Sequence, residues 1–106
     1  MIANTPEPPY FAVIFTSIRT EGDHGYNEMA DRMMELARDQ DGFLGVESSR
    51  DKIGITVSYW RDQKSILNWR NNIEHSIARN LGRKLWYRSF KTRIAKVERD
   101  YGFEQE

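Results

Sequence analysis

The sequence predicts an α+β domain of the ferredoxin-like class, with a four-stranded antiparallel sheet that carries its helices on one face. Three observations support this prediction. The chain has 106 residues, a length that suits one domain. Its hydrophobic spacing switches between a period of two and a period of 3.6, in the order β-α-β-β-α-β. Turn-forming residues separate the segments.

The first predicted strand covers residues 10–19, where β-branched and aromatic side chains are dense enough for a central strand. Residues 1–9 before it contain three prolines, and we expect a flexible N-terminal segment followed by one domain over residues 10–103. Residues 26–40 carry the apolar stripe of an amphipathic helix. Gly42 follows this helix and suits a left-handed residue beyond its end.

Residues 43–50 and 53–60 are predicted to form two strands joined by a polar hairpin connection. The second of these strands alternates with a period of two. Its residues Ile55, Val57 and Tyr59 are expected to face one side, and Trp60 the other.

The second helical region is predicted to break and restart. Asp62 is a candidate N-cap for a short helix that ends near Arg70. Asn71 with Glu74 three residues later resembles a capping box, so we expect the helix to restart there and to continue past residue 82. Gly82 interrupts the apolar stripe, which indicates a close approach to the sheet.

Residues 87–97 are the last predicted strand, with Phe90 and Ile94 on one face and Ala95 and Val97 on the other. Apolar side chains therefore occupy both faces of the first and last strands. The helices can cover only one face of the sheet, and the other would expose a large apolar patch. We therefore expect a homodimer.

Composition excludes several classes of protein. The chain has no Cys, so neither disulfides nor thiolate chemistry is available, and its two His residues predict no metal site. No apolar run approaches the ~20 residues that span a bilayer, and the N-terminus has no signal-peptide pattern, so we expect a cytoplasmic protein without membrane contact. No glycine-rich phosphate loop or hydrolase motif is present.

The charges are unevenly divided although the net charge is zero. Residues 1–51 are acidic in sum and residues 52–106 are basic, most densely over residues 79–99. This basic region is consistent with a solvated face, an anionic ligand, a complementary partner chain or nucleic acid. RNA-recognition domains share the β-α-β-β-α-β order, but their aromatic motif is missing from residues 54–60, so no nucleic acid is expected.

Residues 65–75 hold the candidate site, because Trp69 precedes the helix break and His75 follows it. At the positive end of a helix dipole His75 is expected to be neutral near pH 7. It is a candidate general base or haem ligand, or else a capping histidine at the edge of the core. Trp69 is either the wall of an aromatic pocket or an apolar core anchor.

Four stretches carry a resemblance to a known family: FAVIFTSIR, DGFLGVESSRD, ITVSYWRDQKSILNWRNNIEHSIAR and GRKLWYRSFKTRIAKVERDYGF. Across residues 10–103 the chain resembles the antibiotic biosynthesis monooxygenase (ABM) domain family of dimeric α/β-barrel proteins. The resemblance implies a homodimer whose two sheets pack into a barrel, with a pocket between the sheet and the helices of each subunit. Enzymatic members oxidise aromatic substrates with O₂ without metal or flavin, others open haem, and many have no assigned reaction.

Haem cleavage is not expected, because haem-degrading members carry an Asn on the first strand where this chain offers Thr16 and Ser17. We therefore expect a small monooxygenase-like protein that oxidises an aromatic or quinol-type molecule with O₂, without a cofactor. The alternative is a non-catalytic protein that binds a small hydrophobic ligand or haem. The candidate residues are His75 and Trp69 for catalysis, and Tyr59, Trp60 and Asn72 for substrate binding.

Overall fold

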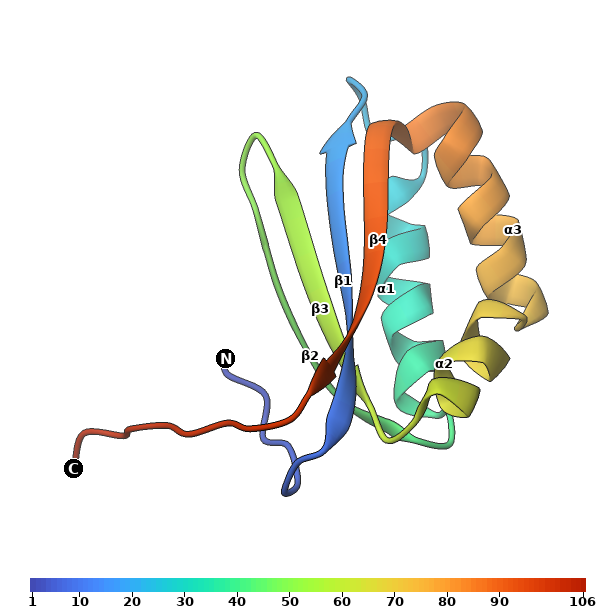
Figure 1. The fold of residues 1–106 in the computed structure, drawn as a ribbon. Coiled ribbons are helices and arrows are strands. Elements are labelled where there is room, and N and C mark those ends of the chain that lie inside the picture. The colour runs from blue at the N-terminus through green and yellow to red at the C-terminus, as the bar shows by residue number, and fades with distance from the viewer.

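A computed structural model describes the backbone of residues 1–106 and every side chain except that of Ile73. Four strands form one antiparallel sheet in the order β2-β3-β1-β4. All helices lie on one face of this sheet, as Figure 1 shows. The fold confirms the predicted ferredoxin-like class, with the second helical region split in two. In chain order the elements are β1 (Tyr10–Arg19), α1 (Tyr26–Arg38), β2 (Phe43–Arg50), β3 (Gly54–Trp60), α2 (Gln63–Arg70), α3 (Ile73–Leu81), a π-helical turn (Gly82–Trp86) and β4 (Tyr87–Val97).

Strand register assigns each side chain to one of the two faces of the sheet. Val13 of β1 is paired with Ser58 of β3 and with Ile94 of β4, so these three side chains share a face. Trp60 lies two residues after Ser58 on the same face and stacks against a residue of α2, so this is the helix-covered face. The other face, called the open face below, carries Ala12, Ile14, Thr16 and Ile18 of β1 and Ile55, Val57 and Tyr59 of β3.

Trp60 is the largest fully buried side chain, with 0% of its surface exposed. Its ring meets that of Phe43 edge to face at a centroid distance of 5.4 Å. Its Nε1–H donates to Ser58 Oγ at 2.9 Å, so the polar edge of the indole is satisfied inside the core. Burying a side chain of about 200 Å² contributes about 5 kcal/mol at 25 cal/mol per Å², which makes Trp60 a major anchor for the helical layer.

The corner between β3 and α2 is held by several polar contacts. Asp62 is the N-cap of α2, as predicted, and its Oδ1 accepts from the backbone N–H of Ser65 at 2.8 Å. Arg61 reaches back to Asp41 at 2.9 Å. Gly42 has a φ of 88°, and a Cβ there would lie 2.0 Å from Ser65 Oγ, so only glycine suits this position.

The predicted capping box at Asn71 is wrong by one residue. Asn71 ends α2, and Asn72 is the N-cap of α3, where its side chain accepts from the backbone N–H groups of Glu74 and His75. Glu74 does not return to the cap as a capping box requires, because its carboxylate pairs with Arg32 of α1 at 3.2 Å. This contact between helices is remote in sequence, so the local pattern did not reveal it.

Gly82 follows α3, where a regular helix through this position was predicted, and begins the π-helical turn instead. Its predicted close approach to the sheet is confirmed, since a Cβ would lie 3.0 Å from Cε2 of Tyr87, the first residue of β4. Tyr87 in turn packs edge to face on Tyr26 of α1 at 5.9 Å. The missing side chain therefore lets the end of the helical layer close onto β4.

Both chain termini lie on the side of the open face (Figure 1). The backbone N–H of Ala3 donates to Glu47 at 2.8 Å. The hydroxyl of Tyr10 accepts from Thr5 and donates to Asp100 Oδ2 at 2.5 Å. These contacts cover the Tyr10 end of the open face and leave its other end uncovered. The flexibility predicted for residues 1–9 stays a prediction.

Candidate functional site

The break between α2 and α3 brings Trp69 and His75 into direct contact. Trp69 lies in the last turn of α2 and His75 in the first turn of α3. Their rings stack with centroids 4.4 Å apart and an interplanar angle of 26°. Trp69 also lies nearly parallel to Trp60, at 6.2 Å and 25°. Trp60, Trp69 and His75 thus form one aromatic stack that runs outward from the core.

A hydrogen bond within this stack fixes the tautomer of His75. Its Nδ1 lies 2.9 Å from the carbonyl oxygen of Trp69. A carbonyl can only accept, so Nδ1 carries the proton and Nε2 keeps its lone pair. Nε2 makes no hydrogen bond to any residue that the structure describes. His75 is therefore arranged as a proton acceptor at Nε2.

The surroundings of His75 keep its imidazole neutral. Burial lowers its pKa below the usual 6.5, and the positive charges of Arg79 and Arg70 lower it further. The hydrogen bond to the Trp69 carbonyl opposes these effects, since it favours a protonated ring. The net shift is downward, so the neutral ring expected at the start of the helix is also the form that burial favours at pH 7.

Arg79 is a functional candidate that the sequence analysis missed. It lies one turn after His75 on the same helix face, a spacing that brings the two side chains together. Its Nε and Nη1 are buried and have no hydrogen-bond partner among the described residues. The sequence showed only one more basic residue in a basic region. The i, i+4 spacing from His75 was the one local signal that set Arg79 apart.

The layer between α3 and β4 is incompletely closed. Ile94 belongs to the helix-covered face of β4, yet 54% of its surface is exposed. Ile77 in the middle of α3 is 51% exposed. The helical layer therefore leaves the β4 edge of the sheet accessible, on the same face that carries the aromatic stack.

Three of the five predicted site residues, Trp60, Trp69 and His75, are brought together by the structure. Trp60 is fully buried behind Trp69, so in this arrangement it supports the stack and has no free surface for a ligand. Asn72 adjoins the stack, but its side-chain oxygen caps α3 and accepts from the N–H of His75 at 3.3 Å. Its clearest contribution is to hold the first turn in which His75 lies.

Tyr59 is separated from the stack, because it belongs to the open face. Its ring packs edge to face on Tyr10 at 5.8 Å. Its hydroxyl donates to Glu47 Oε1 at 2.7 Å, and burial together with this carboxylate raises the pKa of Tyr59 to about 12. Tyr59 is therefore a neutral, engaged phenol that a ligand beside His75 does not reach. Its binding role stays a prediction.

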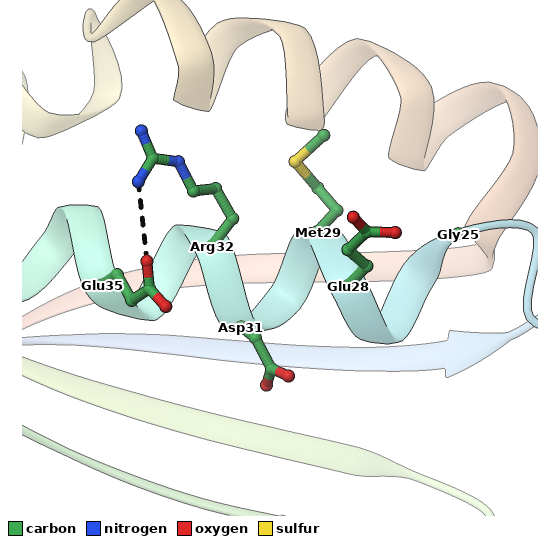
Figure 2. A pocket seen from close by; sticks show the side chains of 6 residues that line it. All are labelled: Gly25, Glu28, Met29, Asp31, Arg32 and Glu35. Carbon is green, nitrogen blue, oxygen red and sulfur yellow. Dashed lines mark ion pairs between the residues drawn. The ribbon is translucent and has the colours of Figure 1, made fainter.

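Neither of two hollows on the described surface is lined by Trp69 or His75. The first, of about 430 Å³, follows one side of α1, and Figure 2 shows its charged lining with the ion pair between Arg32 and Glu35 at 3.5 Å. Met29 and Arg32 point toward α3 in this view, whereas Asp31 points away. The second, of about 300 Å³, lies at the uncovered end of the open face and includes Ile18 and Lys91.

Among the residues that the structure describes, no three His, Asp or Glu side chains lie close enough together to hold a metal ion. No helix in the described chain is both long and apolar enough to cross a membrane.

The sequence matches the family model of the antibiotic biosynthesis monooxygenases over residues 9–80. This match covers more than half of the chain, and the chain therefore belongs to this family. It is also 53% identical to YqjZ of Bacillus subtilis, an uncharacterized protein, over 106 residues that cover 98% of this chain and 93% of the relative.

Solved structures show the same fold at low sequence identity. Rv0793 from Mycobacterium tuberculosis superimposes with a TM-score of 0.77 at 13% identity, covering 88% of this chain and 99% of its own. SnoaB from Streptomyces nogalater, a cofactor-independent oxygenase, superimposes with a TM-score of 0.70 at 9% identity, covering 92% of this chain and 100% of its own. At these identities the similarity establishes the fold alone.

Proposed function

We propose that the protein is a monooxygenase that oxidises an aromatic or quinol-type small molecule with O₂ beside His75. One observation carries the proposal: Nδ1 of His75 is committed to the Trp69 carbonyl, and burial favours the neutral ring. A neutral imidazole with a free Nε2 can take the proton of a phenolic hydroxyl. Membership of a monooxygenase family supports the use of O₂ for the step that follows.

The proposed reaction balances with O₂ as the only co-reactant. His75 removes a phenolic proton, and the resulting anion transfers an electron to O₂. Recombination forms a C–O bond at the ring carbon, and the hydroperoxide then loses water. One oxygen atom ends in the quinone carbonyl and the other in water, while the substrate loses two hydrogens. The proton on His75 leaves with that water, so the base is regenerated.

Trp69 has a positioning role in this proposal. Its ring stacks on His75 and lies nearly parallel to Trp60, which favours the apolar anchor over the pocket wall among its two predicted roles. Its backbone carbonyl instead fixes the tautomer of His75, and its ring fixes the plane of the imidazole. A substrate then approaches the stack from the accessible edge of β4.

A homodimer is part of the proposal. The uncovered end of the open face exposes 39% of Ile18 and 46% of Ile55, and a second copy would bury both. The segment after β4 extends away from the sheet (Figure 1), and it carries Tyr101 and Phe103, which are 94% and 92% exposed. Packing of two open faces would cover this apolar surface and leave the helical layer of each subunit free for a ligand.

The test compares the wild type with His75→Gln and with His24→Gln, a matched control in the exposed loop before α1. Each protein is incubated with a hydroxylated anthrone and a substituted hydroquinone in the presence of a metal chelator. Quinone absorbance and O₂ uptake are recorded, and ¹⁸O₂ reports oxygen transfer. Removing a general base lowers kcat by about 10²–10⁴-fold, and His24→Gln should retain the wild-type rate. Equal rates for His75→Gln and the wild type would contradict the proposal.

The second candidate is a protein that binds haem or another flat ligand without chemistry. The same observation favours it, because a histidine whose Nδ1–H donates to a backbone carbonyl is typical of metal ligation through Nε2. Adding haemin to the wild type and to both His variants separates the two functions. A Soret shift that His75→Gln alone abolishes, together with no oxidation of the quinols, would favour binding.

A further inference from the structure

Arg79 is a partly exposed residue, but two of its guanidinium nitrogens, Nε and Nη1, are buried and have no acceptor among the described residues. A guanidinium cannot be deprotonated in a protein, so its charge persists at this partly buried position. Burial of a charge without a partner is costly, and natural sequences rarely keep one. An acceptor oxygen on a ligand would supply the missing partner.

The position of Arg79 relative to His75 defines what that ligand carries. The positive charge of Arg79 is close enough to lower the pKa of His75. The two side chains lie one turn apart on the same face of α3. One therefore supplies hydrogen-bond donors, and the other supplies a neutral acceptor at Nε2. This pair suits a molecule that carries an anionic oxygen and, close to it, a protonated hydroxyl group.

We infer that Arg79 binds an anionic oxygen, a carboxylate or a phenolate, on the aromatic compound that lies beside His75. A guanidinium binds a carboxylate or a phenolate through charge-assisted hydrogen bonds. Its planar N–H groups therefore select an anionic oxygen over a neutral group on the ligand. The inference rests on the proposed function only for placing the ligand beside His75. It adds the class of ligand, an acidic aromatic compound, and a residue that determines specificity.

The same arrangement assigns Arg79 a second effect on the proposed reaction. Once the proton of the reacting hydroxyl has moved to His75, the ligand gains negative charge. The nearby guanidinium stabilises that charge. A ligand that already pairs with Arg79 also presents its hydroxyl to His75 in one orientation.

Binding of three probes with the same ring system tests this inference without relying on turnover. They are 2-naphthoate, a carboxylate; 4-nitro-1-naphthol, a phenol that ionises near neutral pH; and 2-naphthamide, the neutral control. Dissociation constants are measured anaerobically at pH 7 by titration calorimetry. The proteins are the wild type, Arg79→Met, and Arg83→Met, which replaces an exposed Arg of the π-helical turn and serves as the matched control.

One or both anions should bind the wild type more tightly than the amide does, by about 10-fold or more. Charge-assisted hydrogen bonds to Arg79 account for an affinity difference of this size. Arg79→Met should reduce that preference to about one, and Arg83→Met should keep it. The preferred anion identifies the ligand as a carboxylate or a phenolate. The Tm of Arg79→Met without ligand should equal or exceed that of the wild type, because a partly buried guanidinium with two unpaired nitrogens has been removed.

Equal affinities for the anions and the amide, no binding of either anion, or an unchanged preference in Arg79→Met would overturn the inference. So would a lower Tm of Arg79→Met with no change in preference, since Arg79 would then be structural. The two proposals fail separately. Anion binding that depends on Arg79, without any quinol oxidation, contradicts only the proposed function. Oxidation with equal kcat/KM in the wild type and Arg79→Met contradicts only the inference.

Discussion

Replacing Asn72 by Ala tests how the restart of the helix holds His75. The Asn72 side chain accepts from the N–H of Glu74 at 3.0 Å and from the N–H of His75 at 3.3 Å. Loss of an N-cap costs about 1 kcal/mol. In a domain of this size, that lowers Tm by about 4 °C. Asn72→Ala should show this loss in thermal and urea unfolding followed by circular dichroism at pH 7.

Asn71→Ala is the matched control, because Asn71 ends α2 and its side chain has no hydrogen bond to the described residues. Its change should stay within about 0.5 kcal/mol, as for substitutions away from special contacts. Asn72→Asp keeps the oxygen that caps the helix and adds a negative charge at its N-terminus, so stability should be retained. The same charge should raise the pKa of His75. A greater loss from Asn71→Ala than from Asn72→Ala would refute this account of the helix restart.

Three further predictions concern the pH dependence, the π-helical turn and the open face. In the wild type the unfolding free energy should decline below about pH 6.5, because the native pKa of His75 is lowered and the unfolded chain therefore binds the proton first. His75→Gln should remove this decline. Urea unfolding across this pH range measures it. Gly82→Ala should lower the urea midpoint despite the better helix propensity of Ala, because its Cβ would meet Tyr87 at 3.0 Å, and an unchanged or higher midpoint would contradict that packing. Ile55→Lys should shift the sedimentation coefficient from dimer to monomer, and an unaltered dimer would exclude the open face as the interface.

The bounds of the strands could be predicted from sequence because their signals are local. Tyr10–Arg19, Phe43–Arg50 and Tyr87–Val97 have the predicted limits, since runs of β-branched and aromatic residues end at polar turns. The alternation in β3 also separated Tyr59 from Trp60, and the register confirms that they face opposite sides. A pocket on one side of the sheet could therefore not use both side chains directly.

The details of the site depended on contacts that no local pattern reveals. Asn71 and Asn72 both suit a cap, and Asn72 takes this role while Glu74 pairs with Arg32 from another helix. The contact between Trp69 and His75 could be anticipated, because only a short break separates them. The unpaired donors of Arg79 appear only when the packing around its guanidinium is known.

The proposed reaction requires a neutral His75 that keeps its proton on Nδ1 and leaves Nε2 free. Nitrogen-15 NMR of the imidazole, recorded on the wild type and on His24→Gln to assign the signals, measures both properties in one pH titration. The expected result is the Nδ1–H tautomer at pH 7 with a pKa below 6.5. A ring protonated on Nε2, or a pKa above 6.5, would contradict it and remove the base from the proposed reaction.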